Sequence, residues 1–170
     1  MRSFWTGAML LLLNFSLCAG EAYFQFSDGT REYFIKNQTL PDGARAFTGR
    51  SGTTIILKKG IELSLGKRTV IQRLDEKGST MIFLSKGRLR VKSEGESLKV
   101  KTPVVEVKTG KGSADIIIAN LNCMAVSREG EGLRIATSKK IQDIPVNHYV
   151  LVTVEGSIIV NAPDSHEGSK

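Results

Sequence analysis

Apolar and polar residues alternate along most of the chain after residue 50, with the two-residue period that is typical of β-strands. The clearest case is 61–65, where Ile61, Leu63 and Leu65 alternate with polar residues. β-Branched residues are frequent in these runs, and they favour strands over helices. The pattern predicts strands at 53–57, 61–65, 69–74, 80–84, 87–93, 98–102, 104–108, 115–121, 123–127, 133–136, 149–154 and 157–160.

Short polar links that contain glycine separate these runs, and no window of helical length carries a 3.6-residue apolar stripe. The chain of 170 residues is long enough for one domain with a core of ordinary size. We therefore predict an all-β, single-domain β-roll or β-helix-like (solenoid-type) fold. The same spacing is typical of a β-sandwich or jelly roll, which is the alternative.

Two segments of similar sequence, 56–60 and 83–87, each contain an apolar pair, a basic turn and a closing glycine, Gly60 or Gly87. Two copies are too few for a repeat array. They indicate two places where the chain turns the same kind of corner.

The N-terminus has the pattern of a secretory signal peptide. Arg2 precedes a short apolar segment at 8–17, and small residues follow it before Glu21. The apolar run is roughly ten residues, too short for a membrane-spanning helix. Lipidation at Cys18 is the other possibility, but Leu17 is larger than the residue that normally precedes such a cysteine. We expect residues 1–20 to be cleaved and the protein to be periplasmic or secreted, with no transmembrane span in the mature chain.

Four parts of the chain follow from these patterns. Residues 1–20 form the signal peptide, 21–45 an N-terminal segment whose aromatic residues cover one end of the core, 46–160 the β domain, and 161–170 a disordered tail. Cys123 is then the one cysteine of the mature chain, so no internal disulfide is expected. Its apolar neighbours predict a buried, unreactive thiol.

The charge is basic, +7 for the whole chain, and two predicted strands carry much of it. Arginine or lysine alternates with apolar residues in both, so the cations of each strand point to one side. If 93–98 forms a hairpin turn, Lys92 faces Lys99 and like charges repel across the pair. A strand surface with these cations either only keeps the protein soluble or binds an anion. The candidate contact residues are Arg88, Arg90, Lys92, Lys99 and Lys101.

Other chemistry has little support. The only histidines are His148 and His166, too few and too far apart for a metal site, and no nucleophile-elbow or phosphate-loop motif is complete. We predict no enzyme activity, no metal and no cofactor. Nucleic acid is not an expected partner, because the chain is predicted to be exported and lacks aromatics interleaved with its cations.

Five different short motifs follow one another along the chain: a hairpin at 59–63, a strand pair at 83–91, a corner at 100–107, a strand at 112–117, and a closing motif at 126–130 with 149–152. The most distinctive is the corner Lys101-Thr102-Pro103. This set resembles the FecR-type domain over residues 46–156. The resemblance implies an extracytoplasmic β domain, which in ferric-citrate-type regulators relays a signal from an outer-membrane receptor to a sigma factor. We expect this chain to share the module and to lack the helical segment and membrane span of that relay.

The sequence thus predicts a non-catalytic FecR-like binding or scaffolding module of the bacterial cell envelope. Its expected partner is an envelope protein, or an anionic glycan or lipopolysaccharide that meets the basic strand face. The alternative is a periplasmic carrier of an amphiphile such as a lipopolysaccharide intermediate. A carrier needs an apolar groove, whereas a scaffold needs only a charged outer face.

Overall fold

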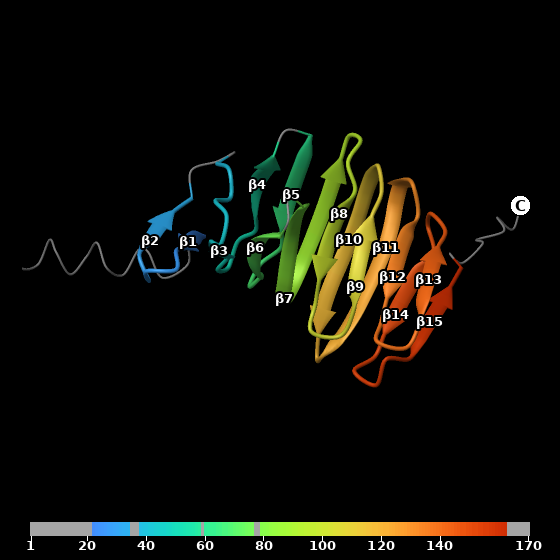
Figure 1. Cartoon of the computed structure of the whole chain (residues 1–170). Helices are drawn as coiled ribbons and strands as arrows, with labels where there is room; N and C mark the ends of the chain where they lie inside the picture. The colour runs from blue at the N-terminus through green and yellow to red at the C-terminus, as the bar shows by residue number, and fades with distance from the viewer. Residues whose placement is uncertain (1–21, 35–37, 59, 77–78, 163–170) are drawn as a thin grey trace, which may run out of the picture.

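The computed structural model describes residues 22–34, 38–58, 60–76 and 79–162, and this part of the chain contains strands and no helix (Figure 1). None of its elements is a helix long and apolar enough to cross a membrane. The strands are β1 (Tyr23–Gln25), β2 (Arg31–Tyr33), β3 (Arg45–Phe47), β4 (Thr53–Lys58), β5 (Ile61–Leu65), β6 (Val70–Glu76), β7 (Ser79–Ser93), β8 (Leu98–Lys101), β9 (Glu106–Thr109), β10 (Gly112–Ala119), β11 (Asn122–Gly130), β12 (Leu133–Ala136), β13 (Ile141–Ile144), β14 (Tyr149–Val152) and β15 (Ile158–Asn161).

Hydrogen bonds join all of these strands into one continuous sheet. Its main path is β13-β12-β9-β8-β7-β10-β11-β14-β15, and β4, β5 and β6 with β1 to β3 branch from β7. The sheet is open, and it lies in two layers, one in front of the other in Figure 1. We call layer A the strands β1, β2, β3, β6, β8, β9, β12 and β13 with the first half of β7. Layer B is β4, β5, β10, β11, β14 and β15 with the second half of β7.

β7 belongs to both layers because it bends at Gly87. Up to Lys86 it pairs with β6, and from Gly87 onward it pairs with β10. Gly87 has a φ of 93°, which L-residues rarely adopt, and a Cβ there would lie 2.4 Å from Oγ1 of Thr69. Glycine is therefore needed at the corner where the chain passes from one layer to the other.

The space between the layers is filled by one cluster of buried side chains to which both layers contribute. Ile82 and Val100 come from layer A, and Leu63, Leu89 and Ile116 from layer B, and each is at most 1% exposed. Each fully buried aliphatic side chain of this kind contributes about 1.5–3 kcal/mol relative to an exposed one. Hydrophobic packing between the layers is thus the main source of stability.

The prediction of an all-β domain is confirmed. A solenoid stacks its coils through parallel pairs, whereas β7–β8 is the only parallel pair of strands in the described residues. The two-layered sheet is compatible with the sandwich alternative, and solenoid coils are not shown. The predicted strands at 80–84 and 87–93 are one bent strand, β7. The pattern did not predict β1, β2, β3 or β13, which have three or four residues each.

The N-terminal aromatic residues differ in their surroundings. Phe24 is completely buried and meets Phe34 edge-on, with ring centroids 3.9 Å apart, whereas Tyr33 is half exposed. The segment therefore extends layer A through β1 and β3 and also contributes to the core. The predicted signal peptide at 1–20 and residues 163–170 of the predicted tail lie outside the described residues.

Candidate functional site

Three of the predicted contact residues lie on the second half of β7, where they point outward from layer B. Arg88, Arg90 and Lys92 alternate there with the buried residues Leu89 and Val91, as the two-residue period predicts. β7 is flanked in this layer by β5 and β10. Lys92 consequently lies opposite Glu62 on one side and Ser113 on the other.

Lys99 and Lys101 lie on the outer face of the other layer. They alternate with buried Leu98 and Val100 on β8, which belongs to layer A. Because β7 and β8 are in different layers at these positions, the five predicted residues do not form one surface.

The hairpin turn at 93–98, which would have placed Lys92 opposite Lys99, does not form. β8 runs parallel to the first half of β7, with Lys99 beside Met81 and Lys101 beside Phe83. The 94–97 turn carries the chain across to layer A instead of folding it back alongside Lys92. The alternation of apolar and polar residues depends only on neighbours in the sequence, and it predicted correctly which side chains of each strand point into the core and which point to solvent. It does not specify which two strands pair with each other.

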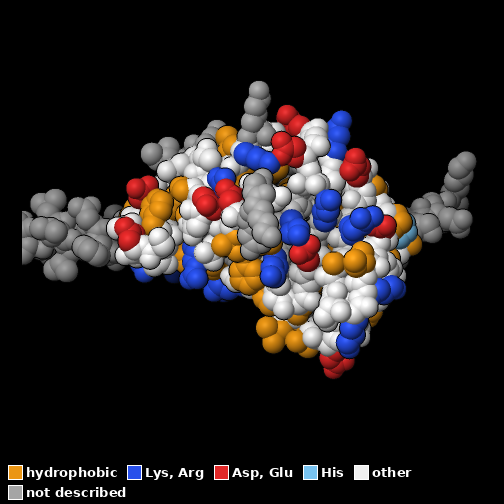
Figure 2. All heavy atoms as spheres, in the orientation of Figure 1, with side chains coloured by type: hydrophobic (Ala, Val, Ile, Leu, Met, Phe, Trp, Pro, Cys, Tyr) orange, Lys and Arg blue, Asp and Glu red, His pale blue; other side chains and the backbone are white. Residues whose placement is uncertain are grey.

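On layer A the cations form a row across three neighbouring strands. Lys99 on β8 lies directly opposite Lys108 on β9, and Lys108 lies opposite Arg134 on β12. Lys101, at the end of β8, lies opposite Glu106. We call Lys99, Lys101, Lys108 and Arg134 the cationic row. Figure 2 shows this face, where blue side chains gather over β8, β9 and β12.

Two carboxylates partly neutralise the cationic row. Nζ of Lys99 lies 3.2 Å from Oε1 of Glu106, and Arg134 donates from Nε to Asp143 at 2.7 Å. The hydrogen bond from Arg134 lowers the pKa of Asp143. Within the described residues, neither Lys101 nor Lys108 forms an ion pair. The row therefore keeps an excess of positive charge.

A broad, open depression of about 530 Å³ adjoins the cationic row. Two cations, two carboxylates and apolar side chains line it: Lys108 and Arg134, Glu131 and Asp143, and Leu133, Ile144 and Pro145. No groups of histidine, cysteine and acidic residues suited to a metal occur in the part of the chain that the structure describes.

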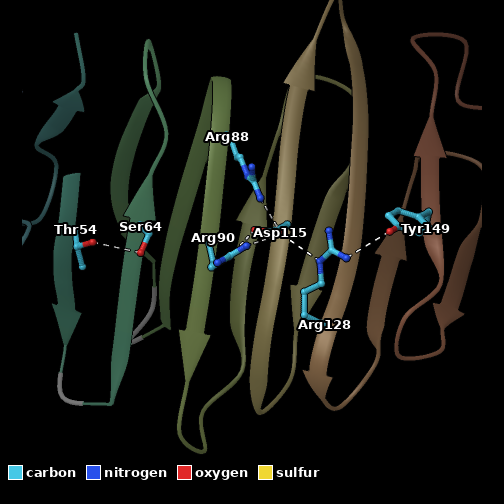
Figure 3. Close-up of polar contacts among 7 residues, drawn as sticks. All are labelled: Thr54, Ser64, Arg88, Arg90, Asp115, Arg128 and Tyr149. Atoms are coloured by element: carbon cyan, nitrogen blue, oxygen red, sulfur yellow. Dashed lines mark hydrogen bonds and ion pairs between the residues drawn. The ribbon is translucent and has the colours of Figure 1, made fainter. Parts of the chain in front are cut away.

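On layer B three arginines surround one buried carboxylate (Figure 3). Asp115 on β10 has a side chain only 2% exposed, yet it points outward, away from the core. Arg90 donates to it from Nε at 2.8 Å and from Nη2 at 3.1 Å. Nη2 of Arg88 donates at 3.1 Å, and Nε of Arg128 on β11 at 3.2 Å. We call these four residues the arginine cluster.

Local features of the backbone hold the cluster in place. The pairing of β10 with β11 shifts by one residue after Ser113, which leaves Arg128 as the extra residue of a bulge, with its guanidinium beside Asp115. Arg128 also donates to the hydroxyl of Tyr149 at 3.3 Å. The backbone of Arg88 is held by Oγ1 of Thr69, which accepts from its N–H at 3.0 Å and donates to its carbonyl at 3.1 Å.

The cluster keeps Asp115 ionised. Burial by itself raises the pKa of a carboxyl group, but the hydrogen bonds from Arg90 and the charges of Arg88 and Arg90 outweigh it. The net result is a pKa of Asp115 below its ordinary value. The same contacts raise the pKa of Arg90. The arginines here serve first to stabilise a buried charge, although their side chains are about half exposed.

Sequence reasoning missed Arg128, Asp115, Lys108 and Arg134. Lys108 and Arg134 do alternate with apolar residues on their strands, so the same signal that found Lys99 could have found them. The contacts of Asp115 with Arg88 and Arg90 have no such signal, because β7 and β10 are separated by β8 and β9 in the sequence.

The free cysteine is confirmed as buried. Cys123 is 1% exposed, and burial raises the pKa of its thiol to about 12. The thiol is therefore protonated and unreactive at neutral pH. The corner at Thr102 and Pro103 is a turn between β8 and β9, closed by Thr102, which donates from N and Oγ1 to the carbonyl of Val105.

The fold is similar to that of solved proteins. Two crystal structures of "a putative anti-sigma factor" from Parabacteroides distasonis match with TM-scores of 0.57 and 0.55 at 16% identity. Each match covers 78% of this chain and 61% or 62% of the solved chain, so this chain spans about three-fifths of that protein. At this identity the likeness shows the fold alone. No protein-family model matches the chain, and no curated protein does.

Proposed function

We propose that this protein is a non-catalytic, FecR-like binding module of the bacterial cell envelope that contacts an anionic partner through the cationic row. One observation carries the proposal, namely that Lys99, Lys108 and Arg134 lie side by side on three adjacent strands. Like charges directly opposite each other destabilise a sheet by some tenths of a kcal/mol up to about 1 kcal/mol. A partner that supplies negative charge explains why the fold carries this cost.

The FecR-like part of the proposal is supported by the resemblance of motifs over residues 46–156. The similarity in fold to a protein described as an anti-sigma factor is consistent with it. The match spans only part of that protein, so the proposal covers the module and not a complete signalling circuit.

The proposed partner is an acidic glycan or lipopolysaccharide, or an envelope protein with an acidic surface. The open depression beside Lys108 and Arg134 gives room for carboxylate or phosphate groups of such a partner. The carrier alternative gains no support, because the interior between the layers is filled by buried side chains.

Binding to a purified acidic polysaccharide and to lipopolysaccharide, measured by biolayer interferometry over a salt series, tests the proposal. We expect binding that weakens steeply with salt, because ionic contacts are screened and counterions are released. Replacing Lys99 and Lys108 together by Gln removes two charges and should weaken binding by about tenfold.

The matched control replaces Lys67 and Lys92 by Gln. These two lysines are exposed and lie outside the face of layer A, in the β5–β6 turn and on layer B. The control changes the net charge equally, so an equal loss of binding in both double variants would show only general electrostatic attraction and would contradict the proposal. Binding that persists at high salt would also contradict it.

We propose that export precedes this function. The apolar segment at 8–17 and the small residues after it support cleavage after Gly20 or after Ala22. Mass spectrometry of the protein from the periplasm or medium should find a chain that begins at Glu21 or Tyr23. An intact Met1 in a cytoplasmic fraction would contradict export.

A further inference from the structure

Three turns meet at one end of the two layers. The 120–121 turn joins β10 to β11, and the 153–157 turn joins β14 to β15. These turns are neighbours because Cys123, just after the first, pairs with Val152, just before the second. The 137–140 turn between β12 and β13 joins them from layer A, where Nζ of Lys139 donates to the carbonyl of Glu155 at 3.4 Å.

Each of these turns presents an aliphatic side chain to solvent. Leu121 is 61% exposed and Val154 is 62% exposed, and Ile141, the first residue after the third turn, is 68% exposed. Single exposed apolar residues are ordinary on protein surfaces, but a group gathered at one end marks an interaction site. Figure 2 shows hydrophobic side chains projecting at the lower end of the view, where these turns lie in Figure 1.

Leu121 occupies a backbone conformation that does not favour leucine. Asn120 and Leu121 have φ values of 49° and 60°, so this two-residue hairpin turn needs the left-handed region at both positions. Asparagine suits the first position, whereas glycine is strongly preferred at the second. The turn would form more easily with glycine, so its strain points to a role for the exposed leucine outside the fold.

Cations surround these apolar tips. Lys139 and Lys140 lie in the third turn, and both are exposed. Lys101 ends β8 at the same end of the layers, since the turn after it brings Thr102 against Cys123. Glu155 is the acidic residue of the three turns. Aliphatic tips within a positive rim match a bilayer that carries anionic lipids, where apolar side chains enter the headgroup boundary and lysines meet phosphates. A second copy of this chain fits less well, because its lysines would repel those of the first.

We infer that this end of the protein docks on an anionic lipid bilayer, with Leu121, Ile141 and Val154 entering its interface. Apart from Lys101, which lies at this end, the inference does not depend on the cationic row, which lies on the outer face of layer A. Each feature therefore has an experiment of its own.

Co-sedimentation of the chain without the proposed signal peptide, residues 21–170, with vesicles tests the inference. The vesicles contain equal parts of phosphatidylglycerol and phosphatidylcholine, and pure phosphatidylcholine vesicles serve for comparison. We expect binding to the anionic vesicles and at least about tenfold weaker binding to the neutral ones. The triple variant L121G/I141T/V154S should bind the anionic vesicles about tenfold less tightly or worse.

Two further variants separate docking from loss of structure. Leu121→Gly alone relieves the turn, so it should weaken vesicle binding while its melting temperature stays the same or rises. Tyr33→Thr removes another exposed hydrophobic side chain, from β2 in the N-terminal part of layer A, and should bind like the original protein. Equal binding by the triple variant, equal loss in Tyr33→Thr, or no vesicle binding by the original protein would each overturn the inference. Loss of vesicle binding with intact polysaccharide binding in the triple variant would confirm that the two surfaces are separate.

Discussion

The two outer faces of this protein use the same local pattern, cations alternating with apolar residues, in opposite ways. On layer B, Arg88, Arg90 and Arg128 converge on the buried carboxylate of Asp115. On layer A, Lys99 and Lys108 lie beside Arg134, and the carboxylates that approach the row are themselves partly or largely exposed. Positive charge therefore stabilises the fold on layer B, whereas on layer A like charges lie opposite one another and work against the fold.

The residue types suit these two roles. Arginine presents a planar fork of N–H donors that can hold a carboxylate in a fixed geometry, while lysine is a mobile point charge on a flexible stem. Substitutions with the same change of charge should consequently have different effects on the two faces. The following predictions start from the corner that separates the faces and proceed to smaller effects.

Gly87→Ala should give the largest effect, a loss of about 4 kcal/mol in the free energy of unfolding. The new Cβ would lie 2.4 Å from Oγ1 and 2.6 Å from Cα of Thr69, at a φ of 93°. Urea unfolding followed by circular dichroism measures the loss. The control is Gly95→Ala, where nothing lies within 4 Å of the added Cβ and stability should stay within about 0.5 kcal/mol. Equal stability of the two variants would show that β7 does not bend as described.

Asp115→Asn should cost about 2–3 kcal/mol, since it leaves three guanidinium groups together without their counter-charge. The cost is at or below the lower end of the range of about 3–5 kcal/mol for broken buried pairs, because the arginines are half exposed and water screens them. On the other face, Asp143→Asn should leave the unfolding midpoint unchanged, because its pair with Arg134 is exposed. A midpoint shift of similar size in both variants would remove the distinction between the faces.

Acid should destabilise the protein through Asp115. Its pKa is lowered in the folded state, so its contribution is complete above the unfolded pKa of about 3.9 and is lost as the pH falls through the folded pKa. The difference in stability between the original protein and Asp115→Asn should be constant from neutral pH down to about pH 4 and shrink below that. Thermal melts at several pH values measure it. A difference that shrinks already near pH 6 would contradict a lowered pKa.

The smallest effects should differ in sign. Arg90→Gln removes hydrogen bonds to Asp115 and should cost about 1 kcal/mol, whereas Lys108→Gln should leave stability unchanged or raise it by a few tenths of a kcal/mol. Both variants lose one positive charge, so each is the control for the other in chemical unfolding. A loss of stability in Lys108→Gln equal to that in Arg90→Gln would mean that the cationic row also supports the fold.

The sequence predicts local facing better than pairing. Leu98 and Val100 were expected inside and Lys101 outside, and the structure agrees because alternation depends only on neighbouring residues. The residue that lies opposite Lys99 depends on which turn next to β8 is a hairpin turn. The turn at Pro103 joins β8 to β9 as a hairpin, whereas the 94–97 turn does not pair the strands that it joins.

The arginine cluster was beyond prediction for a related reason. Asp115 occupies an outward position, where a polar residue is expected to meet water. Its burial depends on arginines of β7 and β11. Arg128 reaches it through a β-bulge, which no feature of the sequence predicts. The sequence predicts a corner at Gly87, and the structure has one. A glycine at a bend within one strand cannot be distinguished by sequence from a glycine at the end of a strand, so β7 was predicted as two strands.

The bent strand β7 also bears on how the protein unfolds. It pairs with β6 and β8 in layer A and with β5 and β10 in layer B, so neither layer can come apart at β7 without breaking pairings of this strand. Segments far apart in the chain must meet around it, which is typical of domains that fold slowly and in one step. The backbone amides of β7 should therefore exchange with deuterium only when the whole molecule unfolds, while those of the edge strands β13 and β15 exchange by local fraying.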